Sequence, residues 1–281
     1  MPFDIEQITS LQNPKIKDIV ALRAHSELRR ERGVFIVEGQ RELSRCIEGG
    51  YRLSSVFFCE SIITEDEMSG MFSNISLFTF KEDFKMFRVS DKVYEKIAYR
   101  DTTEGLLAIV ESGSPKVLDE LVLSDNPLVV VLESVEKPGN LGAVLRTTDA
   151  CRADAVIVCD PLTDIFNPNL IRASLGGVFV QNVVACTSEE AIKWLKEKQF
   201  RIFTAQLQDS VDYYDSDMTG ATALVFGTEA DGLSDIWREA SDCKIKIPML
   251  GHIDSLNVSV SAAILCYEAL RQRQKKQVTA E

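Results

Sequence analysis

The second half of the chain alternates short apolar runs with amphipathic stretches, and this alternation limits the possible fold more than any other feature. Runs rich in β-branched residues predict strands at residues 128–132, 155–159, 182–186, 201–205, 223–226 and 244–247. Helical patterns fall between or after them, at residues 141–150, 169–175, 189–199, 234–240 and 256–273. Strands separated by helices predict an α/β domain with a mostly parallel sheet, which binds ligands at the carboxyl ends of its strands.

A smaller α/β domain is predicted before this sheet. Its β-rich runs at residues 34–37, 53–58, 75–80 and 106–110 alternate with helical patterns at residues 38–48 and 91–98. Small and turn-forming residues at 111–115 separate the two patterned blocks. Because 281 residues suit two domains better than one, we place the domains at residues 1–112 and 117–281.

The net charge of −12 argues against a generic nucleic-acid binder, because contacts with phosphates normally require a basic surface. The segment from Lys15 to Arg52, however, contains nine basic residues and only six acidic ones. This run includes Arg29, Arg30 and Arg32, and it predicts a local cationic face inside an acidic protein. A solvated helix face with mixed ion pairs is the alternative interpretation.

Other classes of protein are disfavoured by what the sequence lacks. No apolar run is long enough to span a membrane, and residues 1–10 do not resemble a signal peptide, so we expect a cytoplasmic protein. The seven cysteines are scattered and form no C-x-x-C pair. They are expected to be buried, reduced thiols, and no metal site is expected, because no Cys/His/carboxylate set has ligand spacing.

Three loops after predicted strands carry unusual sets of polar residues. In the first, Pro138, Gly139 and Asn140 open a helix, and Asn140 is expected to act from its N-cap, with Arg146 six residues further on. The alternative is an ordinary Asn-capped helix with Arg146 on its solvent-exposed face. The second loop, residues 226–234, contains Gly227, which is expected to let a ligand approach the backbone closely.

The second loop differs from the dinucleotide-binding fingerprint, because Glu229 stands where a phosphate-binding loop would carry no charge. The third loop, residues 248–259, gathers Gly251, Asp254, Ser255 and Asn257 before a long helix. The loop therefore carries more polar residues than are needed to cap one helix.

Taken together, these loops resemble the motifs of the SpoU (TrmH-type) branch of the SPOUT RNA methyltransferases. The matching residues are Asn140-x-Gly142-x-x-x-Arg146, Gly227-x-Glu229-x-x-Gly232-Leu233, and residues 247–249 with 255–259; residues 166–174 also look like the family. Residues 10–14 and 35–39 are similar to the small ribosomal-protein-like RNA-binding domain that often precedes the catalytic domain. Thr228, Ala230 and Lys137 depart from the family pattern.

The resemblance implies a C-terminal SPOUT-type sheet with a deep trefoil knot, which binds S-adenosylmethionine in a bent form. Carried over residue by residue, the cofactor contacts fall on Gly227, Ile247, Met249 and Leu256. The resemblance also gives Arg146 the role of activating a ribose hydroxyl, either as the base or by stabilising the developing alkoxide. Asn140 and Glu229 would orient Arg146 or the ribose, and Asn257 would complete the polar site.

The implied activity is methylation of a ribose 2′-hydroxyl in a structured RNA, with ribosomal RNA preferred over transfer RNA. DNA is excluded as a substrate, because it lacks this hydroxyl. Arg172 is a candidate phosphate contact, and a homodimer is expected through the apolar helix at residues 256–273. The alternatives are the same chemistry on transfer RNA and a non-catalytic RNA-binding homologue. A nucleotide-dependent enzyme is disfavoured, because both G-x-x-x-x-G-K-[ST] and G-x-G-x-x-G are missing.

Overall fold

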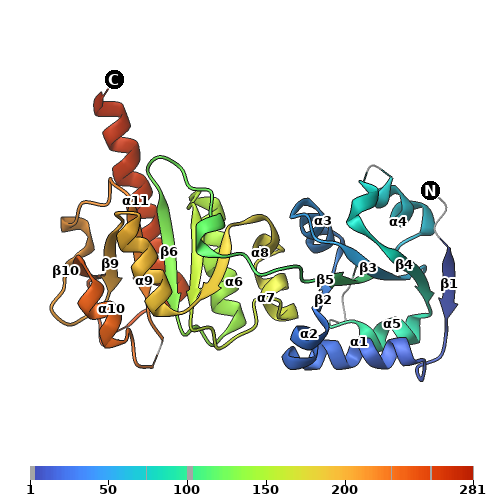
Figure 1. Cartoon of the computed structure of the whole chain (residues 1–281). Helices are drawn as coiled ribbons and strands as arrows, with labels where there is room; N and C mark the ends of the chain where they lie inside the picture. Colours follow the sequence, from blue (N-terminus) through green and yellow to red (C-terminus); the bar gives the residue numbers. More distant parts are fainter. Residues whose placement is uncertain (1–3, 74, 100–103, 229, 254, 281) are drawn as a thin grey trace. The chain divides into compact units, whose positions relative to one another are not determined.

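The chain divides into two compact units in a computed structural model that describes residues 4–73, 75–99, 104–228, 230–253 and 255–280, with side chains to residue 275 (Figure 1). The N-terminal unit consists of residues 1–114 together with residues 164–180. The C-terminal unit consists of residues 115–163 and 181–281. Residues 164–180 therefore belong to the N-terminal unit, although the sequence predicted them in the second domain.

The N-terminal unit is built on a mixed sheet, with five strands in the described residues in the order β1-β4-β3-β5-β2. The strands are β1 (Ile5–Ile8), β2 (Val34–Glu38), β3 (Leu53–Cys59), β4 (Phe80–Val89) and β5 (Leu106–Glu111). The helices are α1 (Pro14–Ala24), α2 (Ser26–Arg32), α3 (Gln40–Glu48), α4 (Glu65–Phe72) and α5 (Asp91–Ile97). One face of the sheet packs on α1 and α5, whose Ile16, Ile19 and Val93 are fully buried.

The strand predicted at residues 75–80 is wrong. Those residues form mainly the short 3₁₀ helix η1 (Leu77–Thr79), where the Ser76 side chain accepts a hydrogen bond from the Phe78 amide. The strand β4 begins only at Phe80 and continues to Val89. A serine at the start of a turn competes with strand pairing through this local side-chain bond.

Residues 164–180 form α7 (Pro168–Ala173) and α8 (Gly177–Val180), which contact β2 and α3 of the N-terminal unit. The Phe166 ring stacks on Phe35, with ring centroids 4.4 Å apart and planes 5° from parallel. Phe179 stacks on the same Phe35 ring at 5.5 Å. These three aromatic side chains give the segment an apolar attachment to the unit.

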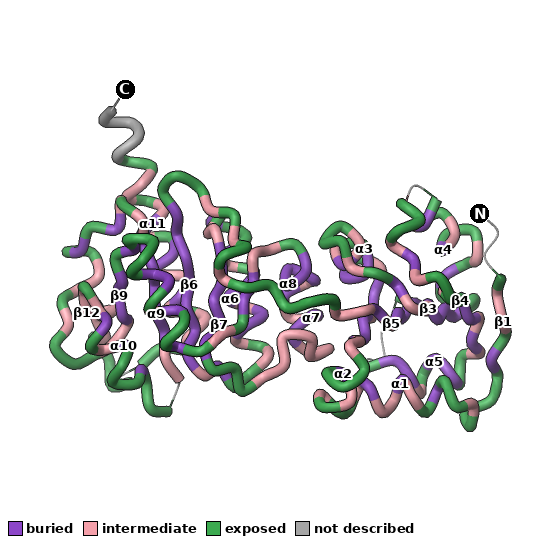
Figure 2. The backbone as a smooth tube through the Cα atoms, viewed as in Figure 1, coloured by how far each residue is buried: buried purple, intermediate pink, exposed green. Residues whose placement is uncertain are grey.

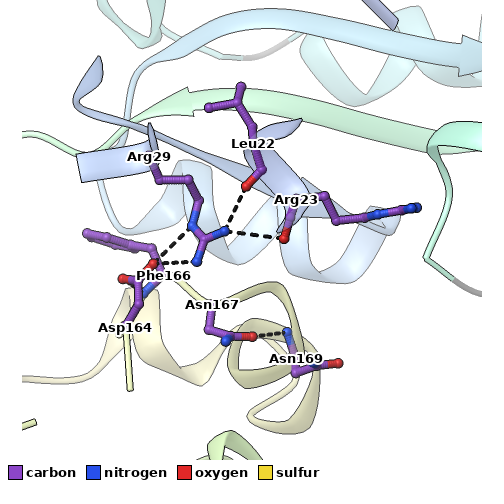
Figure 3. A network of polar contacts seen from close by, with 7 residues as sticks. All are labelled: Leu22, Arg23, Arg29, Asp164, Phe166, Asn167 and Asn169. Atoms are coloured by element: carbon purple, nitrogen blue, oxygen red, sulfur yellow. Dashed lines mark hydrogen bonds and ion pairs between the residues drawn. The ribbon is translucent and has the colours of Figure 1, made fainter. Parts of the chain in front are cut away.

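A buried ion pair holds the start of the same segment (Figure 3). The Arg29 side chain is only 4% exposed, and its Nε and Nη2 donate to one Asp164 carboxylate oxygen at 2.9 and 2.6 Å. Its Nη1 donates to the carbonyl oxygens of Leu22 and Arg23. The guanidinium is thus committed to the inside of the N-terminal unit.

The C-terminal unit contains a parallel sheet, with seven strands in the described residues in the order β10-β12-β9-β11-β6-β7-β8. The strands are β6 (Leu128–Glu133), β7 (Ala155–Cys159), β8 (Val183–Cys186), β9 (Arg201–Ala205), β10 (Val211–Asp212), β11 (Thr222–Phe226) and β12 (Cys243–Lys246). The helices are α6 (Pro138–Ala150), α9 (Ser188–Glu197), α10 (Asp235–Ala240) and α11 (Val258–Ala280). The predicted α/β fold with a parallel sheet is confirmed.

The centre of this sheet is buried on both faces. Every residue of β6, β7 and β11 is buried, which is why these strands are continuous apolar runs (Figure 2). The helix α11 packs on α6 and β11 through Ala262, Leu265, Cys266 and Ala269. Within the described residues, no helix has both the length and the apolar character needed to cross a membrane. All seven cysteines lie in described parts of the chain and are free thiols.

Candidate active site at the carboxyl edge of the parallel sheet

The three loops that the sequence singled out follow β6, β11 and β12. In the sheet, β12, β9, β11 and β6 are consecutive neighbours and run parallel. Their carboxyl ends therefore lie at one edge, and the loops that follow them meet there. This is the edge where open parallel sheets bind ligands.

A cavity of about 570 Å³ opens between the segments that follow β9, β11 and β12. This volume lies in the range of small-molecule sites, roughly 300–1,000 Å³. The four predicted cofactor contacts, Gly227, Ile247, Met249 and Leu256, all line it. Its other walls include the apolar side chains of Phe226, Leu233, Ile245 and Val258 and the polar side chains of Gln206, Arg238, Lys246 and Asn257.

Gly227 is required by the loop itself. A Cβ atom at this position would lie 2.1 Å from the carbonyl oxygen of Gly232, far inside van der Waals contact. The loop closes tightly here, because Thr228 and Gly232 exchange two backbone hydrogen bonds of 3.0 and 3.2 Å. The loop's own backbone is therefore one reason for the glycine, and the expected close approach of a ligand stays a prediction. Glu229, between them, lies outside the described residues, as does Asp254 in the third loop.

Asn140 does not cap its helix, contrary to the prediction. The N-cap of α6 is Lys137, and Asn140 is the third residue of the helix. The Asn140 Oδ1 atom instead accepts a hydrogen bond from Asn257 Nδ2 at 3.1 Å. The Asn257 Oδ1 atom in turn accepts from the Ser259 amide and hydroxyl at the start of α11. Two predicted site residues, 117 positions apart in sequence, are thus joined directly.

Arg146 lies exposed on α6, two turns after the start of the helix. Among the described residues, none forms a hydrogen bond or ion pair with its guanidinium, and none of its donors reaches Asn140 or Asn257. The structure therefore joins Asn140 to Asn257, which lines the cavity, and leaves Arg146 as a separate, solvent-facing cation.

The four arginines proposed to bind RNA occupy different environments. Arg29 is corrected: a guanidinium buried against Asp164 has its donors committed within the protein. Arg30 is exposed, and Arg32 is exposed while pairing with Asp18. Arg172 is half-buried, with its guanidinium 4.8 Å from the centre of the exposed Tyr99 ring. Tyr99 was missed, because a single tyrosine after a helix carries no sequence signal.

Two further polar side chains of the cavity, Gln206 and Arg238, were also missed. Gln206 directly follows β9, and this place at the carboxyl end of a predicted strand was the signal that could have found it. Arg238 lies inside the short helix α10, where it looks like any charged helix residue.

Both units of the chain are similar to known proteins. A model of the SpoU rRNA Methylase family matches residues 127–267, and a model of the MRM3-like substrate binding domain matches residues 13–108. The 23S rRNA (guanosine(2553)-2′-O)-methyltransferase RlmP of Bacillus subtilis is 27% identical over 266 residues, which cover 94% of this chain and 98% of that protein.

Solved structures extend the likeness to the whole chain. The crystal structure of an RNA 2′-O ribose methyltransferase matches with a TM-score of 0.81 and 34% identity, covering 96% of this chain and 100% of that one. The SpoU methyltransferase AviRb from Streptomyces viridochromogenes, in complex with the cofactor AdoMet, matches with a TM-score of 0.83 and 25% identity, covering 94% and 99%. The family model matches half of the residues, and a solved relative at 34% identity matches nearly the full length. The chain therefore belongs to the SpoU rRNA methylase family.

Proposed function

We propose that this protein transfers a methyl group from S-adenosylmethionine to the 2′-hydroxyl of a ribose in ribosomal RNA. The observation that carries the proposal is the cavity at the carboxyl edge of the parallel sheet. Gly227, Ile247, Met249 and Leu256 line it, and so does Asn257, which donates a hydrogen bond to Asn140. The names of the relatives support the choice of RNA, since RlmP is a 23S rRNA 2′-O-methyltransferase.

The cavity fits the cofactor in size and in lining. Its apolar walls suit the flat adenine ring, and its polar atoms suit the hydrogen-bonding groups of adenosine and methionine. Gly227, Ile247, Met249 and Leu256 would hold the cofactor, which supplies an electrophilic methyl group on a sulfonium. The trefoil knot implied by the family stays part of this proposal.

The chain's own residues would prepare the nucleophile. A ribose hydroxyl is a poor nucleophile until its proton leaves. The exposed Arg146 would meet that hydroxyl, as the base or as a cation that stabilises the developing alkoxide. Asn140 and Asn257, already fixed by their mutual hydrogen bond, would orient the ribose. Glu229, assigned to the same site, lies outside the described residues.

The N-terminal domain, residues 1–112, would bind the RNA, and the domain from residue 117 would carry out the chemistry. The match of residues 13–108 to a substrate binding domain supports this division. The exposed Arg30 and Arg32 and the half-buried Arg172 are the candidate phosphate contacts.

We also propose a homodimer through α11. Its residues Val260 and Tyr267 are 46% and 49% exposed, while Ala262, Leu265, Cys266 and Ala269 of the same helix are buried in their own unit. Exposed apolar side chains on one helix would be buried if a second copy of the chain packed against it.

Mapping ribose methylation by mass spectrometry tests the activity. Ribosomal and transfer RNA from a strain that lacks the protein would be compared with RNA from the parent strain. We expect one 2′-O-methyl group to disappear from ribosomal RNA and to return when the purified protein and S-adenosylmethionine are added. A loss confined to transfer RNA would favour the alternative substrate. Unchanged methylation in both would favour a non-catalytic RNA-binding homologue.

A further inference from the structure

One exposed tyrosine of the N-terminal unit has two arginines beside its ring. Tyr99 directly follows the C-cap of α5 and is 43% exposed. The guanidinium carbon of Arg172 lies 4.8 Å from the centre of the ring, and that of Arg23 lies 6.0 Å from it. Both distances are those of cation–π contacts. The three side chains therefore form one cluster, and its aromatic member is accessible to solvent.

Local hydrogen bonds hold Tyr99 and Arg23 in place. The Tyr99 amide donates to Glu38 Oε2 at 2.9 Å. Arg23 Nη1 donates to the carbonyl oxygens of Ile97 at 3.2 Å and Ala98 at 2.6 Å, at the C-terminal end of α5. Carbonyl groups at the end of a helix have no partner within the helix, and a basic side chain commonly satisfies them. The ring and one of its two cations are therefore positioned before a ligand binds.

Neither arginine of the cluster has an acidic partner. Over the part of the chain that the structure describes, neither Arg23 nor Arg172 forms an ion pair. Arg29 and Arg32 of the same unit, by contrast, are each paired with an aspartate. The hydrogen bonds that Arg23 makes to described residues all use Nη1, so its Nε and Nη2 groups stay available. Two guanidinium groups without a counter-ion form a suitable site for a phosphate, which arginine binds through its planar fork of donors.

An exposed aromatic ring beside cations is the combination with which proteins bind unpaired nucleotides. The base stacks on the ring, and the cations bind the phosphate backbone. A base inside a duplex is already paired and stacked between its neighbours, so it does not reach such a ring. The Tyr99 cluster therefore suits a single-stranded segment of RNA better than a helical one.

A purely structural role explains the cluster less well. The segment that carries Arg172 is already attached to its unit by the buried pair of Arg29 with Asp164 and by the stacking of Phe166 on Phe35. An exposed cation–π contact is among the weaker interactions of this kind. It adds little to an attachment that buried contacts already provide.

Resting on the proposed function, we infer that Tyr99, Arg23 and Arg172 bind an unpaired nucleotide of the RNA. Its base stacks on the Tyr99 ring, and its phosphate oxygens accept hydrogen bonds from the two guanidinium groups. Residues 13–108, which include Arg23 and Tyr99, match a substrate binding domain, and this supports the assignment. The site distinguishes single strands from duplexes and tolerates different sequences, because every base has a face that can stack.

Binding of two RNA probes to the full chain tests the inference. One probe is a short single-stranded RNA of mixed sequence, and the other is the same strand annealed to its complement. Tyr99→Leu should weaken binding of the single strand about tenfold and leave the affinity for the duplex unchanged, because only an unpaired base loses a stacking partner. Tyr99→Phe keeps the ring and should bind both probes as the unmodified protein does. Phe78→Leu is the matched control, since it removes an 88% exposed aromatic ring from the same unit.

The two arginines are tested by the salt dependence of binding. Arg23→Gln and Arg172→Gln should each flatten the salt dependence for the single strand, because each variant loses a phosphate contact and releases fewer counterions. Arg201→Gln is the matched control. Its guanidinium lies 5.0 Å from the centre of the Phe203 ring, but that ring is fully buried and offers no surface to a base.

Three results would overturn the inference: unchanged binding of the single strand by Tyr99→Leu, an equal loss on both probes, or a loss with Tyr99→Phe as large as that with Tyr99→Leu. An unmodified protein that binds the duplex as tightly as the single strand would also overturn it. Calorimetric titration with S-adenosylhomocysteine separates this outcome from failure of the proposed function. A protein that binds this compound but fails the comparison of the two probes loses only the Tyr99 site, whereas one that binds neither the compound nor RNA loses both.

Discussion

Arg29 and Asp164 are 135 residues apart in sequence and form a buried ion pair inside the N-terminal unit, with side chains 4% and 13% exposed. The pair attaches residues 164–180, which lie between β7 and β8 in sequence, to α2 of the N-terminal unit. The aromatic stack of Phe166 on Phe35 attaches the same segment through apolar contact.

We predict that Asp164→Ala destabilises the N-terminal unit by about 3–5 kcal/mol, because it leaves the Arg29 cation buried without its partner. Asp18→Ala is the matched control. It removes the carboxylate of the exposed Arg32 pair, whose side chains are 45% and 34% exposed, and should cost about 0–1 kcal/mol. Native-state hydrogen exchange of the β2 amides measures the free energy of opening this unit. Equal costs for the two variants would contradict a structural role for the pair.

The sequence predicted the parts of the fold whose signal is local. The strands β6, β7 and β11 are visible because burial on both faces demands continuous apolar runs. The attachment of residues 164–180 to the N-terminal unit was not predictable, because Phe166 and Phe179 show only that the segment is buried somewhere. Arg29 was misassigned for a related reason: a run of arginines does not show which one a short helix turns inward.

The site was predictable to the extent that it follows family motifs. The second and third motifs located loops that line the cavity, but the local role predicted for Asn140, as a helix cap, was wrong, and the sequence did not show the loop closure at Gly227. The cap of α6 and the closure of the second loop depend on backbone geometry that spacing does not encode. Gln206 and Arg238 reach the same cavity only through the packing of β9 and α10.

We predict that Gly227→Ala weakens binding of S-adenosylhomocysteine by more than about tenfold, because the new Cβ atom would collide with the Gly232 carbonyl and force the loop open. Gly251→Ala is the control, since a Cβ atom at that glycine meets nothing within 4 Å. Calorimetric titration of both variants makes the comparison. Similar affinities in the two variants would show that closure of the second loop does not shape the cavity.

We predict that the protein is a homodimer and that Val260→Glu dissociates it, because the substitution places a charge on the apolar surface of α11. Val122→Glu is the control, since Val122 is an 81% exposed apolar residue outside α11. Light scattering at micromolar concentration should give twice the chain mass of 31.4 kDa for the unmodified protein and for the control. A mass of one chain for the unmodified protein would rule out the dimer.

We predict that exchanging Arg30 and Arg32 together for glutamine weakens RNA binding and flattens its dependence on salt, because fewer counterions are released. The control is Lys193→Gln, which removes a 77% exposed cation from α9 in the C-terminal unit. Binding of ribosomal RNA fragments would be titrated at several salt concentrations. Identical salt slopes for the double variant and the unmodified protein would assign this run to a solvated helix face.

The last prediction concerns Arg146, which the structure leaves exposed on α6 without a partner among the described residues. If Arg146 acts on the ribose hydroxyl, its contribution belongs to the transition state. Arg146→Ala should then lower the rate of methyl transfer by about 10²–10³ while leaving cofactor affinity nearly unchanged. Arg146→Lys should not restore the rate, because a compact ammonium does not reproduce the planar guanidinium.

The control is Arg152→Ala, which removes another exposed arginine, two residues after α6. Single-turnover transfer to ribosomal RNA with saturating cofactor measures the rate, and a titration of the same protein measures affinity. Near-normal transfer by Arg146→Ala would remove this arginine from the mechanism, and an equal loss of cofactor binding would make its role structural.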